Sequence, residues 1–301
     1  PTYLVETNIN NFVLRRKPPG KLLKSAHAVD RECRVMTALH DTDVPVPKTF
    51  GYCDDETVIG TPFFVMDHVV GNIYWELLLP GCDPNQRREI YLSMNDTIAK
   101  LHNVDFNKVN LADYGKHENY MGRQIHRWTK QYKDSETQVI PEINELIEWL
   151  PKNIPSDQET SIVHGDFRLD NMIFDPITHE VKAILDWELS TLGNPIADFT
   201  YHMMSWRLPA GAKGLGMMGS DLKSLNIPSE SEYAELYYKK TGREKIDNWD
   251  FYMAYNIFRL AGIAQGIVGR VRDGTASSSE AKNYEAFVPI LSLIHISEPT
   301  R

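Results

Sequence analysis

One segment, residues 162–198, constrains the fold of this chain more than any other. It begins with apolar residues, continues with a His-Gly-Asp triplet that ends at Asp166, and carries Asn171 five residues later. Two short apolar runs follow, Met172–Phe174 and Val181–Leu185, joined by a polar stretch that contains proline. This pattern predicts a β-hairpin, because branched and aromatic residues favour strands whereas Asp, Pro and Thr favour turns.

The predicted hairpin brings three polar side chains to one of its ends. Asp186 directly follows the second apolar run, so we expect it to lie close to Asp166 and Asn171. Phosphoryl transfer from a metal-bound nucleotide needs such a set: one Asp orients the attacking hydroxyl and accepts its proton, while an Asn and a second Asp hold magnesium. We therefore predict Asp166 as the catalytic base, and Asn171 and Asp186 as metal ligands. The alternative interpretation is an ordinary hairpin with polar turn residues.

At this point the sequence resembles the aminoglycoside phosphotransferase family, the small-molecule branch of the protein-kinase-like fold. Protein kinases carry His-Arg-Asp and Asp-Phe-Gly at the two aspartates, whereas this chain has His-Gly-Asp and then Asp-Trp-Glu at 186–188. The resemblance implies a two-lobed α+β fold. Residues 1–70 would form a small antiparallel-sheet N-lobe that binds nucleotide and lacks the first strand. Residues 71–294 would form a mainly helical C-lobe with the catalytic loop and the acceptor site, and ATP and Mg²⁺ would be the cofactors.

The N-terminal strands supply candidate phosphate-binding residues. Thr2–Glu6 and Phe12–Arg15 are predicted to be strands joined by a turn. Kinases place a lysine on such a strand to hold the nucleotide phosphates, and here Arg15 occupies that place; a solvated basic strand edge is the alternative. Ser25–His40 is predicted to be a helix, and its Glu32 is the expected ion-pair partner of Arg15. For Glu32 the alternative is an exposed helix charge without a function.

A further strand leads to a predicted site for the nucleotide base. Pro62–Met66 runs into the sequence Asp-His-Val-Val-Gly, and the closing Gly71 suits a hinge between lobes. By the family resemblance, an adenine ring is expected to lie against this stretch and to use backbone groups near Asp67 and Val69. Met66 is expected to lie behind the ring.

Beyond Gly71 the pattern is mostly helical. Asp83 followed by Pro84 predicts a helix start, since Asp is a good N-cap and proline fits the first turn. A second amphipathic helix is predicted over Tyr120–Lys133. Its basic face consists of four residues at helical spacing: Arg123, Arg127, Lys130 and Lys133. Such a face is usually a solvated surface, and the alternative is a site for an anionic substrate such as the phosphates of coenzyme A.

The spacing after Asp186 restricts the class of acceptor. Only 11 residues separate Asp186 from Asp198, which we expect to cap the next helix in a structural role. A protein kinase needs an activation loop and an Ala-Pro-Glu segment after its Asp-Phe-Gly to hold a peptide. The sequence has no Ala-Pro-Glu there and no room for a long loop before the helix. The acceptor is therefore expected to be a small molecule.

The C-terminal part is predicted to contain two more helices. Asp247–Val271 is apolar almost all round, so we expect a buried helix. A further helix is predicted from about Ser279 to Leu293. Residues 295–301 continue no pattern and are interpreted as a foreign, cloning-derived tail outside the fold.

Composition and charge exclude several classes of function. With 301 residues, of which 42% are hydrophobic, the chain can bury a sizeable core and form two lobes around a cleft. A formal net charge of −9 argues against nonspecific nucleic-acid binding. The 3 cysteines form no Cys-x-x-Cys pair, which suits a reducing intracellular compartment without structural disulfides. No signal peptide is visible, and no apolar run reaches the roughly 20 residues that span a bilayer.

Within the family, the sequence most resembles the N-terminal kinase-like domain of acyl-CoA dehydrogenase family members ten and eleven. The residues that carry this resemblance lie in four stretches: Phe12–Leu23, Val44–Pro47, His164–Arg168 and Ile184–Glu188. In that group an acyl-CoA dehydrogenase module follows the domain. The resemblance implies phosphorylation of the hydroxyl of a hydroxyacyl-CoA in fatty-acid catabolism, in a mitochondrial or peroxisomal compartment.

The sequence departs from the family pattern in two places. The family carries a first strand and a glycine-containing phosphate loop before the position that matches Pro1, and this chain begins inside that segment. The other departure is arginine at position 15, where most kinases have lysine. Arginine binds phosphate bidentately and stays charged, so we expect it to be tolerated.

Two other functions stay open on the sequence alone. One is a kinase for an amino alcohol, a sugar or an aminoglycoside, since the acidic net charge suits a cationic acceptor. The other is a pseudokinase that serves as a docking module for an acyl-CoA dehydrogenase. The intact Asp166, Asn171 and Asp186 favour an active enzyme over a pseudokinase.

Overall fold

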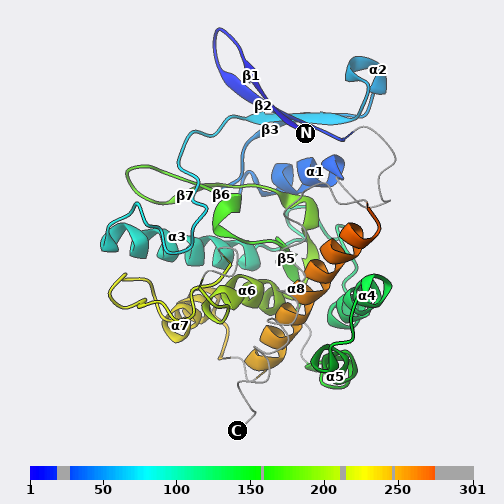
Figure 1. Cartoon of the computed structure of the whole chain (residues 1–301). Helices are drawn as coiled ribbons and strands as arrows, with labels where there is room; N and C mark the ends of the chain where they lie inside the picture. Colours follow the sequence, from blue (N-terminus) through cyan, green and yellow to red (C-terminus); the bar gives the residue numbers. More distant parts are fainter. Residues whose placement is uncertain (19–27, 157–158, 211–214, 246–247, 275–301) are drawn as a thin grey trace. The chain divides into compact units, whose positions relative to one another are not determined.

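The computed structural model describes residues 1–18, 28–156, 159–210, 215–245 and 248–274 (Figure 1). The chain divides into two compact units. The first comprises Pro1–Gly115, Ser161–Leu192 and Asp221–Glu244, and the second comprises Lys116–Thr160, Gly193–Ser220 and Lys245–Arg301. All the predicted catalytic, metal-binding and nucleotide-binding residues belong to the first unit. The lobe boundary predicted between residues 70 and 71 is a different division and stays a prediction.

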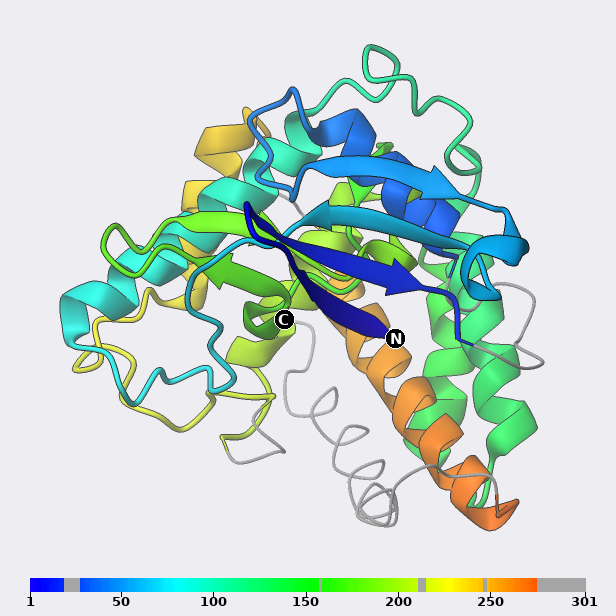
Figure 2. The ribbon, with the colours of Figure 1, turned by 90° about the horizontal axis from the view of Figure 1, so that it is seen from above.

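The first unit contains a four-stranded antiparallel sheet in the order β1-β2-β4-β3 (Figure 2). Its strands are β1 (Thr2–Glu6), β2 (Asn11–Arg16), β3 (Thr49–Cys53) and β4 (Phe63–Asp67). In β4, Phe64 and Met66 are buried, whereas the residues between and beside them are half-buried. This alternation is what a strand with one covered face produces, because successive side chains point to opposite faces. The predicted small antiparallel sheet is confirmed.

Helix α1 (Val29–Leu39) packs against β3 and β4. It is shorter than the predicted helix Ser25–His40, of which residues 25–27 lie outside the described part of the chain. The buried side of α1 is apolar apart from one residue: Val29, Glu32, Cys33, Val35, Met36 and Leu39. An acidic side chain on the covered face of a helix needs a partner, and Glu32 has one in Arg15.

Helix α3 (Pro84–Asn103) begins where the sequence predicts. The Asp83 side chain accepts hydrogen bonds from the backbone of Asn85 and Gln86, and the Gln86 side chain accepts from the Asp83 backbone, which completes a capping box. Helix α7 (Glu230–Thr241) packs against α3. The short helix α2 (Glu56–Ile59) lies between β3 and β4 in the sequence.

The predicted hairpin is present in the same unit. Strand β6 (Met172–Phe174) pairs antiparallel with β7 (Val181–Ile184), and the Asp175 side chain accepts two backbone hydrogen bonds in the turn that joins them. Strand β5 (Ser161–Val163) precedes the hairpin and pairs with β8 (Thr191–Gly193), which follows it. A 3₁₀ turn, Leu169–Asn171, directly precedes β6, and a second one, Trp187–Leu189, begins directly after Asp186.

The second unit is helical. Its elements are α4 (Tyr120–Ser135), α5 (Pro141–Trp149), α6 (Pro195–Met203) and α8 (Trp249–Arg272), with short 3₁₀ turns at Leu150–Lys152 and Met204–Trp206. Helices α4 and α8 pack together, and the apolar face of α4 is buried: Met121, Ile125, Trp128 and Tyr132. Most of α8 is buried, which confirms the prediction for this segment. In the described residues, no helix combines the length and apolar character that crossing a membrane requires.

One predicted helix cap is wrong. Asn194, not Asp198, caps α6: its side-chain Oδ1 accepts hydrogen bonds of 2.9 Å from the backbone of Ile196 and Ala197. Asp198 lies buried in the first turn of the helix instead. Pro195 explains the difference, because proline prefers the first helical position and the residue before it becomes the cap. The predicted helix 279–293 and the tail 295–301 lie outside the described residues.

Candidate active site

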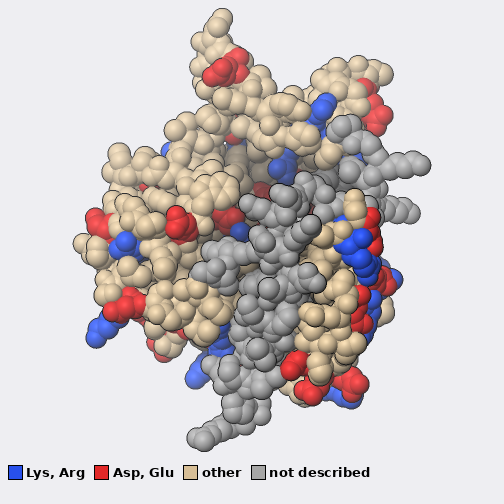
Figure 3. Space-filling model, in the orientation of Figure 1, with Lys and Arg blue, Asp and Glu red and all other residues tan. Residues whose placement is uncertain are grey.

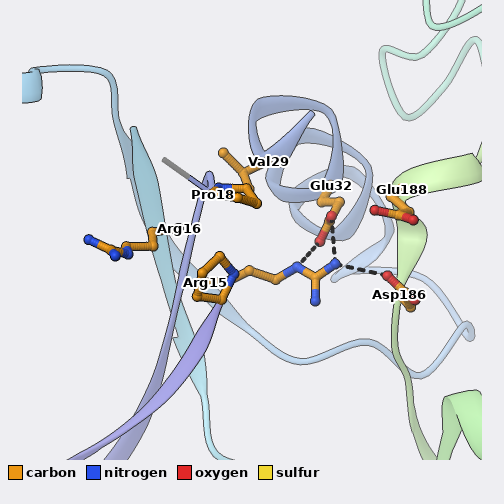
Figure 4. Close-up of a pocket in the computed structure, with 8 residues that line it drawn as sticks. Arg15, Arg16, Pro18, Val29, Glu32, Asp186 and Glu188 are labelled. Carbon is orange, nitrogen blue, oxygen red and sulfur yellow. Dashed lines mark hydrogen bonds and ion pairs between the residues drawn. The ribbon is translucent and has the colours of Figure 1, made fainter. Parts of the chain in front are cut away.

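Arg15 connects three segments of the first unit (Figure 4). Its Nε lies 2.5 Å from Oε2 of Glu32, and its Nη2 lies 2.8 Å from Oε1 of the same carboxylate. Nη2 also lies 2.8 Å from Oδ1 of Asp186. The ion pair predicted between Arg15 and Glu32 is therefore present, and a residue of the predicted metal site lies directly beside it.

Burial sets the electrostatics of this ion pair. Only 2% of the Glu32 side chain is exposed, and burial raises the pKa of its carboxyl above the ordinary value although the Arg15 charge acts in the opposite direction. Burial lowers the pKa of Arg15, but the charges of Glu32 and Asp186 outweigh it, so that the pKa is raised overall. A buried carboxylate held by two guanidinium nitrogens fixes the arginine in one orientation.

A cavity of about 260 Å³ opens beside the Arg15 guanidinium. Its walls come from β2 and the residues around it, from α1 and from the turn after β7: Pro1, Arg15, Arg16, Pro18, Val29, Glu32, Asp186 and Glu188 (Figure 4). The cavity carries both signs of charge, as a site for a metal-bound anion requires. It lies within the first unit.

Glu188 lines this cavity, and its role was not predicted from the sequence. Carboxylate oxygens of Glu32, Asp186 and Glu188 all lie within 4.8 Å of one another. The only signal in the sequence was its position two residues after Asp186, which in the structure directly precedes the 3₁₀ turn that contains Glu188. With Arg15 as the cation among them, the three carboxylates leave this corner with an excess of negative charge.

The loop that carries Asp166 is hydrogen-bonded to the strand that ends beside Asp186. The backbone N–H of Asp166 donates to Nδ1 of His164 at 3.2 Å, so the ring carries its hydrogen on Nε2, which donates to the Leu185 carbonyl at 2.9 Å. The Leu185 N–H donates to the Asn171 carbonyl at 2.8 Å. His164 is fully buried. These bonds hold Asp166, Asn171 and Asp186 at the same end of the hairpin, as predicted.

The glycine of the His-Gly-Asp triplet has a steric reason. Gly165 has φ +83°, a conformation that other residues rarely adopt. A Cβ built there would lie 2.7 Å from the Leu189 carbonyl oxygen and 3.0 Å from the Leu189 Cβ. Only glycine allows the loop that carries Asp166 to pass so close to the turn after β7. Asp186 itself has φ +63°, an unusual value for a residue with a side chain and one found at functional sites.

Asn171 and Asp186 fit the chemistry of a magnesium site. The Asn171 amide nitrogen donates to the Asp166 backbone carbonyl at 2.9 Å and to Asp166 Oδ2 at 3.1 Å. This orientation leaves the Asn171 side-chain oxygen on the side away from those bonds. Amide and carboxylate oxygens are the ligands that magnesium prefers. The donor set therefore matches the predicted metal.

Met66, one of the predicted base-site residues, shares a sheet face with Arg15. In the register of β2 and β4, Arg15 lies opposite Phe64, and Val13 lies opposite Met66. Residues two apart on a strand, and residues opposite each other on neighbouring strands, point to the same face. Met66 is therefore on the face that carries Arg15.

The backbone groups of Asp67 and Val69, near which the base is predicted to bind, differ in their hydrogen bonding. The Asp67 N–H donates to the Lys48 carbonyl at 2.9 Å. Val69 is half-buried, and within the described residues no backbone carbonyl accepts its N–H. The predicted base contact at Val69 is therefore geometrically available.

The basic face of α4 lies in the second unit, and two of its four basic residues are paired with carboxylates. Lys130 pairs with Asp134 at 2.6 Å, and Lys133 lies 3.4 Å from Glu136. Arg123 donates to the Lys116 carbonyl at 2.8 Å. Lys and Arg atoms lie among Asp and Glu atoms on this part of the surface (Figure 3). These pairs favour the interpretation of α4 as a solvated surface.

Comparisons with known proteins agree with the kinase-like geometry. The model of the phosphotransferase enzyme family matches residues 1–235. The chain is 46% identical over 283 residues to acyl-CoA dehydrogenase family member 10 of Mus musculus, with 94% of this chain and 26% of that protein covered. It is 42% identical over 283 residues to acyl-CoA dehydrogenase family member 11 of Homo sapiens, with 93% of this chain and 36% of that protein covered. The chain thus spans about a quarter to a third of these relatives.

The chain is also similar to a solved structure from Ralstonia eutropha, that of a protein assigned as an aminoglycoside phosphotransferase. It has a TM-score of 0.92 and 47% sequence identity, with 99% of this chain and 88% of that chain covered. The resemblance inferred from the sequence and the predicted kinase-like α+β fold are both confirmed.

Proposed function

Because the chain belongs to the phosphotransferase enzyme family and has its kinase-like fold, we propose that it transfers the γ-phosphoryl group of ATP to a hydroxyl of a small molecule. The observation that carries the proposal is the arrangement of Arg15 between Glu32 and Asp186. A cation fixed by a buried helix carboxylate, next to a metal-binding Asp, is the phosphate-holding arrangement of kinase-like enzymes. The experiment below tests it directly.

Arginine can do the work of the usual lysine here because it has three nitrogens. Nε and Nη2 of Arg15 bind Glu32, and Nη2 also reaches Asp186. Among the described residues, Nη1 has no such partner, so it is the nitrogen that would contact a phosphate oxygen. A planar guanidinium can bind a carboxylate on one edge and present the remaining nitrogen to an anion.

Asn171 and Asp186 would hold magnesium on the triphosphate. An ion held there would neutralise charge on the phosphate oxygens and favour departure of ADP as the leaving group. Asp186 also touches Arg15, so the phosphate-binding cation and the metal site share one carboxylate. This arrangement couples nucleotide binding to metal binding.

Asp166 would orient the acceptor hydroxyl and take its proton. The Asn171 amide holds the Asp166 carboxylate through Oδ2, which fixes its rotation. His164 holds the backbone of the same residue. A base fixed in this way needs no reorganisation when the acceptor arrives. The adenine would lie on the sheet face of Met66 and use the backbone N–H of Val69.

For the acceptor we propose a hydroxyacyl-CoA. The support is the identity of 46% and 42% to relatives whose names include acyl-CoA dehydrogenase, of which this chain matches a quarter to a third. A dehydrogenase module would then be the partner, in a fatty-acid-degrading compartment such as the mitochondrion or peroxisome. The net charge of −9 would suit a cationic acceptor such as an amino alcohol or an aminoglycoside, and a sugar is the remaining alternative.

The test is a transfer assay with Mg²⁺-ATP against a panel of acceptors. Hydroxyacyl-CoAs with the hydroxyl at different carbons are compared with choline, homoserine and aminoglycosides. ADP release is measured, and the phosphorylated product is identified by mass spectrometry. We expect ADP and phosphorylated product with hydroxyacyl-CoA. Normal ATP binding without transfer to any acceptor would indicate a pseudokinase docking module instead.

A further inference from the structure

The linker after the predicted base site, residues 70–72, is hydrogen-bonded to the hairpin formed by β6 and β7. The Asn72 N–H donates to the Phe174 carbonyl of β6 at 2.8 Å, and the Phe174 N–H donates to the Asn72 carbonyl, also at 2.8 Å. Lys182 of β7 also contacts this linker: its Nζ donates a hydrogen bond to the Val70 carbonyl at 3.0 Å. The segment predicted as a hinge is thus fastened at Val70 and Asn72.

Gly71 lies between Val70 and Asn72 and explains why the hydrogen bonds at these two residues matter. A Cβ there would lie 2.3 Å from the Phe174 carbonyl oxygen and 2.6 Å from Cγ2 of Ile173, so no side chain fits. Glycine permits the close approach, but it leaves the adjoining peptide groups freer to rotate than any other residue would. The carbonyl of the Val70–Gly71 peptide is the one that Lys182 binds. Lys182 therefore restrains the peptide that the glycine leaves mobile.

The second partner of Lys182 is Asp175, whose Oδ2 lies 3.7 Å from Nζ. Asp175 is chiefly a turn residue: its Oδ1 accepts from the backbone of Ile177 at 2.8 Å and of Thr178 at 3.0 Å. These backbone bonds, with Lys182 as a smaller influence, lower the pKa of Asp175. The contact between Lys182 and Val70 is shorter and directed at the linker. The two contacts can be separated by substitution.

The segment that would meet the adenine is held on both sides. At one end the Asp67 N–H is bonded to the Lys48 carbonyl. At the other end Lys182 and the Asn72–Phe174 bond pair hold the linker. Val69 lies between these anchors, one residue from the carbonyl that Lys182 binds. A backbone donor fixed in advance binds a ligand without an ordering cost.

We infer that Lys182 is a positioning residue for the nucleotide base, which acts through the Val70 carbonyl on the backbone of Val69. The inference rests on the proposed function, since it takes Met66, Asp67 and Val69 as the base site. The inference predicts different effects of Lys182 on binding of the base and on binding of the phosphates. The phosphates would meet Arg15 and the metal ligands, which Lys182 does not touch. Lys182 should therefore affect ligands that carry a base and leave inorganic polyphosphate unaffected.

The experiment compares binding of Mg²⁺-ATP and of Mg²⁺-tripolyphosphate to the whole chain by calorimetry. Lys182→Met keeps the aliphatic stem and removes the ammonium group. Loss of one partly exposed charge-assisted hydrogen bond should weaken ATP binding by about 3- to 10-fold. Tripolyphosphate binding should not change, and Lys182→Arg should restore ATP binding. kcat at saturating ATP should stay at the wild-type value.

Two controls isolate the contact with Val70. Asp175→Asn retains an oxygen that can accept the turn bonds but removes the charge near Lys182, and it should leave ATP binding unchanged. Lys108→Met removes an exposed lysine whose ion-pair partner among the described residues is Asp105, at 3.7 Å, and should also leave ATP binding unchanged. Equal ATP binding in Lys182→Met and wild type would overturn the inference, as would equal weakening of ATP and tripolyphosphate. If the wild-type chain bound tripolyphosphate but showed no preference for ATP, both the inference and the proposed function would be contradicted.

Discussion

At the scale of single residues, Arg15 shows why arginine and lysine are not equivalent in this site. Its guanidinium bonds to Glu32 through two nitrogens and to Asp186 through one of them. A lysine has one nitrogen on a flexible stem, so it would use the same nitrogen for Glu32 and for a phosphate and could not make the two-nitrogen contact with Glu32. The exposed fraction of the Arg15 side chain is 24%, and Glu32 is almost fully covered. The pair is therefore screened little by solvent.

This difference leads to a prediction for Arg15→Lys. The variant should raise KM for Mg²⁺-ATP by about tenfold, on the order of 1.4 kcal/mol, because the bidentate contact and the fixed phosphate donor are lost together. Arg88→Lys is the matched control: Arg88 pairs with Glu232 of α7 and takes no part in the site. Steady-state kinetics at saturating acceptor measures the effect. A wild-type KM in Arg15→Lys would show that the guanidinium geometry is unimportant.

At the scale of elements, an ion-pair network connects α3 to α7. Asp96 of α3 lies 2.9 Å from Lys240 of α7 and 2.8 Å from Lys100 of its own helix. Partial burial acts to raise the pKa of Asp96, but the two lysines outweigh it and lower the pKa overall. Since 41% of the side chain is exposed, solvent screening keeps the contribution of the network to stability small.

The pH dependence of this network can be predicted with its sign. A carboxyl whose folded-state pKa lies below its unfolded value stabilises the fold fully above the unfolded pKa. It loses that contribution as the pH falls through the folded one. Asp96→Asn should therefore lower Tm by about 1–3 °C at neutral pH and make no difference at a pH below the folded-state pKa. Thermal unfolding from neutral to acidic pH measures this. A Tm difference that persists undiminished in acid would contradict the assignment.

At the scale of the whole molecule, sequence reasoning succeeded where the signal was local. The hairpin β6–β7, the helix start at Asp83 and the buried α8 follow from patterns within a few turns or strands. The pairing of Arg15 with Glu32 joins residues 17 positions apart and was expected through the family resemblance. The prediction for the α6 cap was wrong because Asn and Asp are both good caps, and the position of Pro195 directly after Asn194 decides between them.

The contacts that sequence could not provide are long-range. Lys182 and Val70 are 112 positions apart, and neither residue type marks the contact. Gly165 could be noticed as a departure from His-Arg-Asp, but its cause is the proximity of Leu189, which only the folded chain shows. Glu188 is a common surface residue type until α1 brings Glu32 beside it. Such details depend on the tertiary arrangement, and the pattern of residues along the chain does not encode them visibly.

The measurement that tests the central claim most directly is single-turnover phosphoryl transfer by Asp166→Asn, with the acceptor identified in the panel above. The variant keeps the size of the side chain and an oxygen that can accept a hydrogen bond, but it cannot take the proton. A positioned general base contributes about 10²–10⁴-fold to rate, so the transfer rate should fall by that factor. ATP affinity, measured separately, should hardly change, because Asp166 is not a metal ligand in this scheme. An unchanged rate would reduce Asp166 to a structural turn residue and contradict the proposed mechanism.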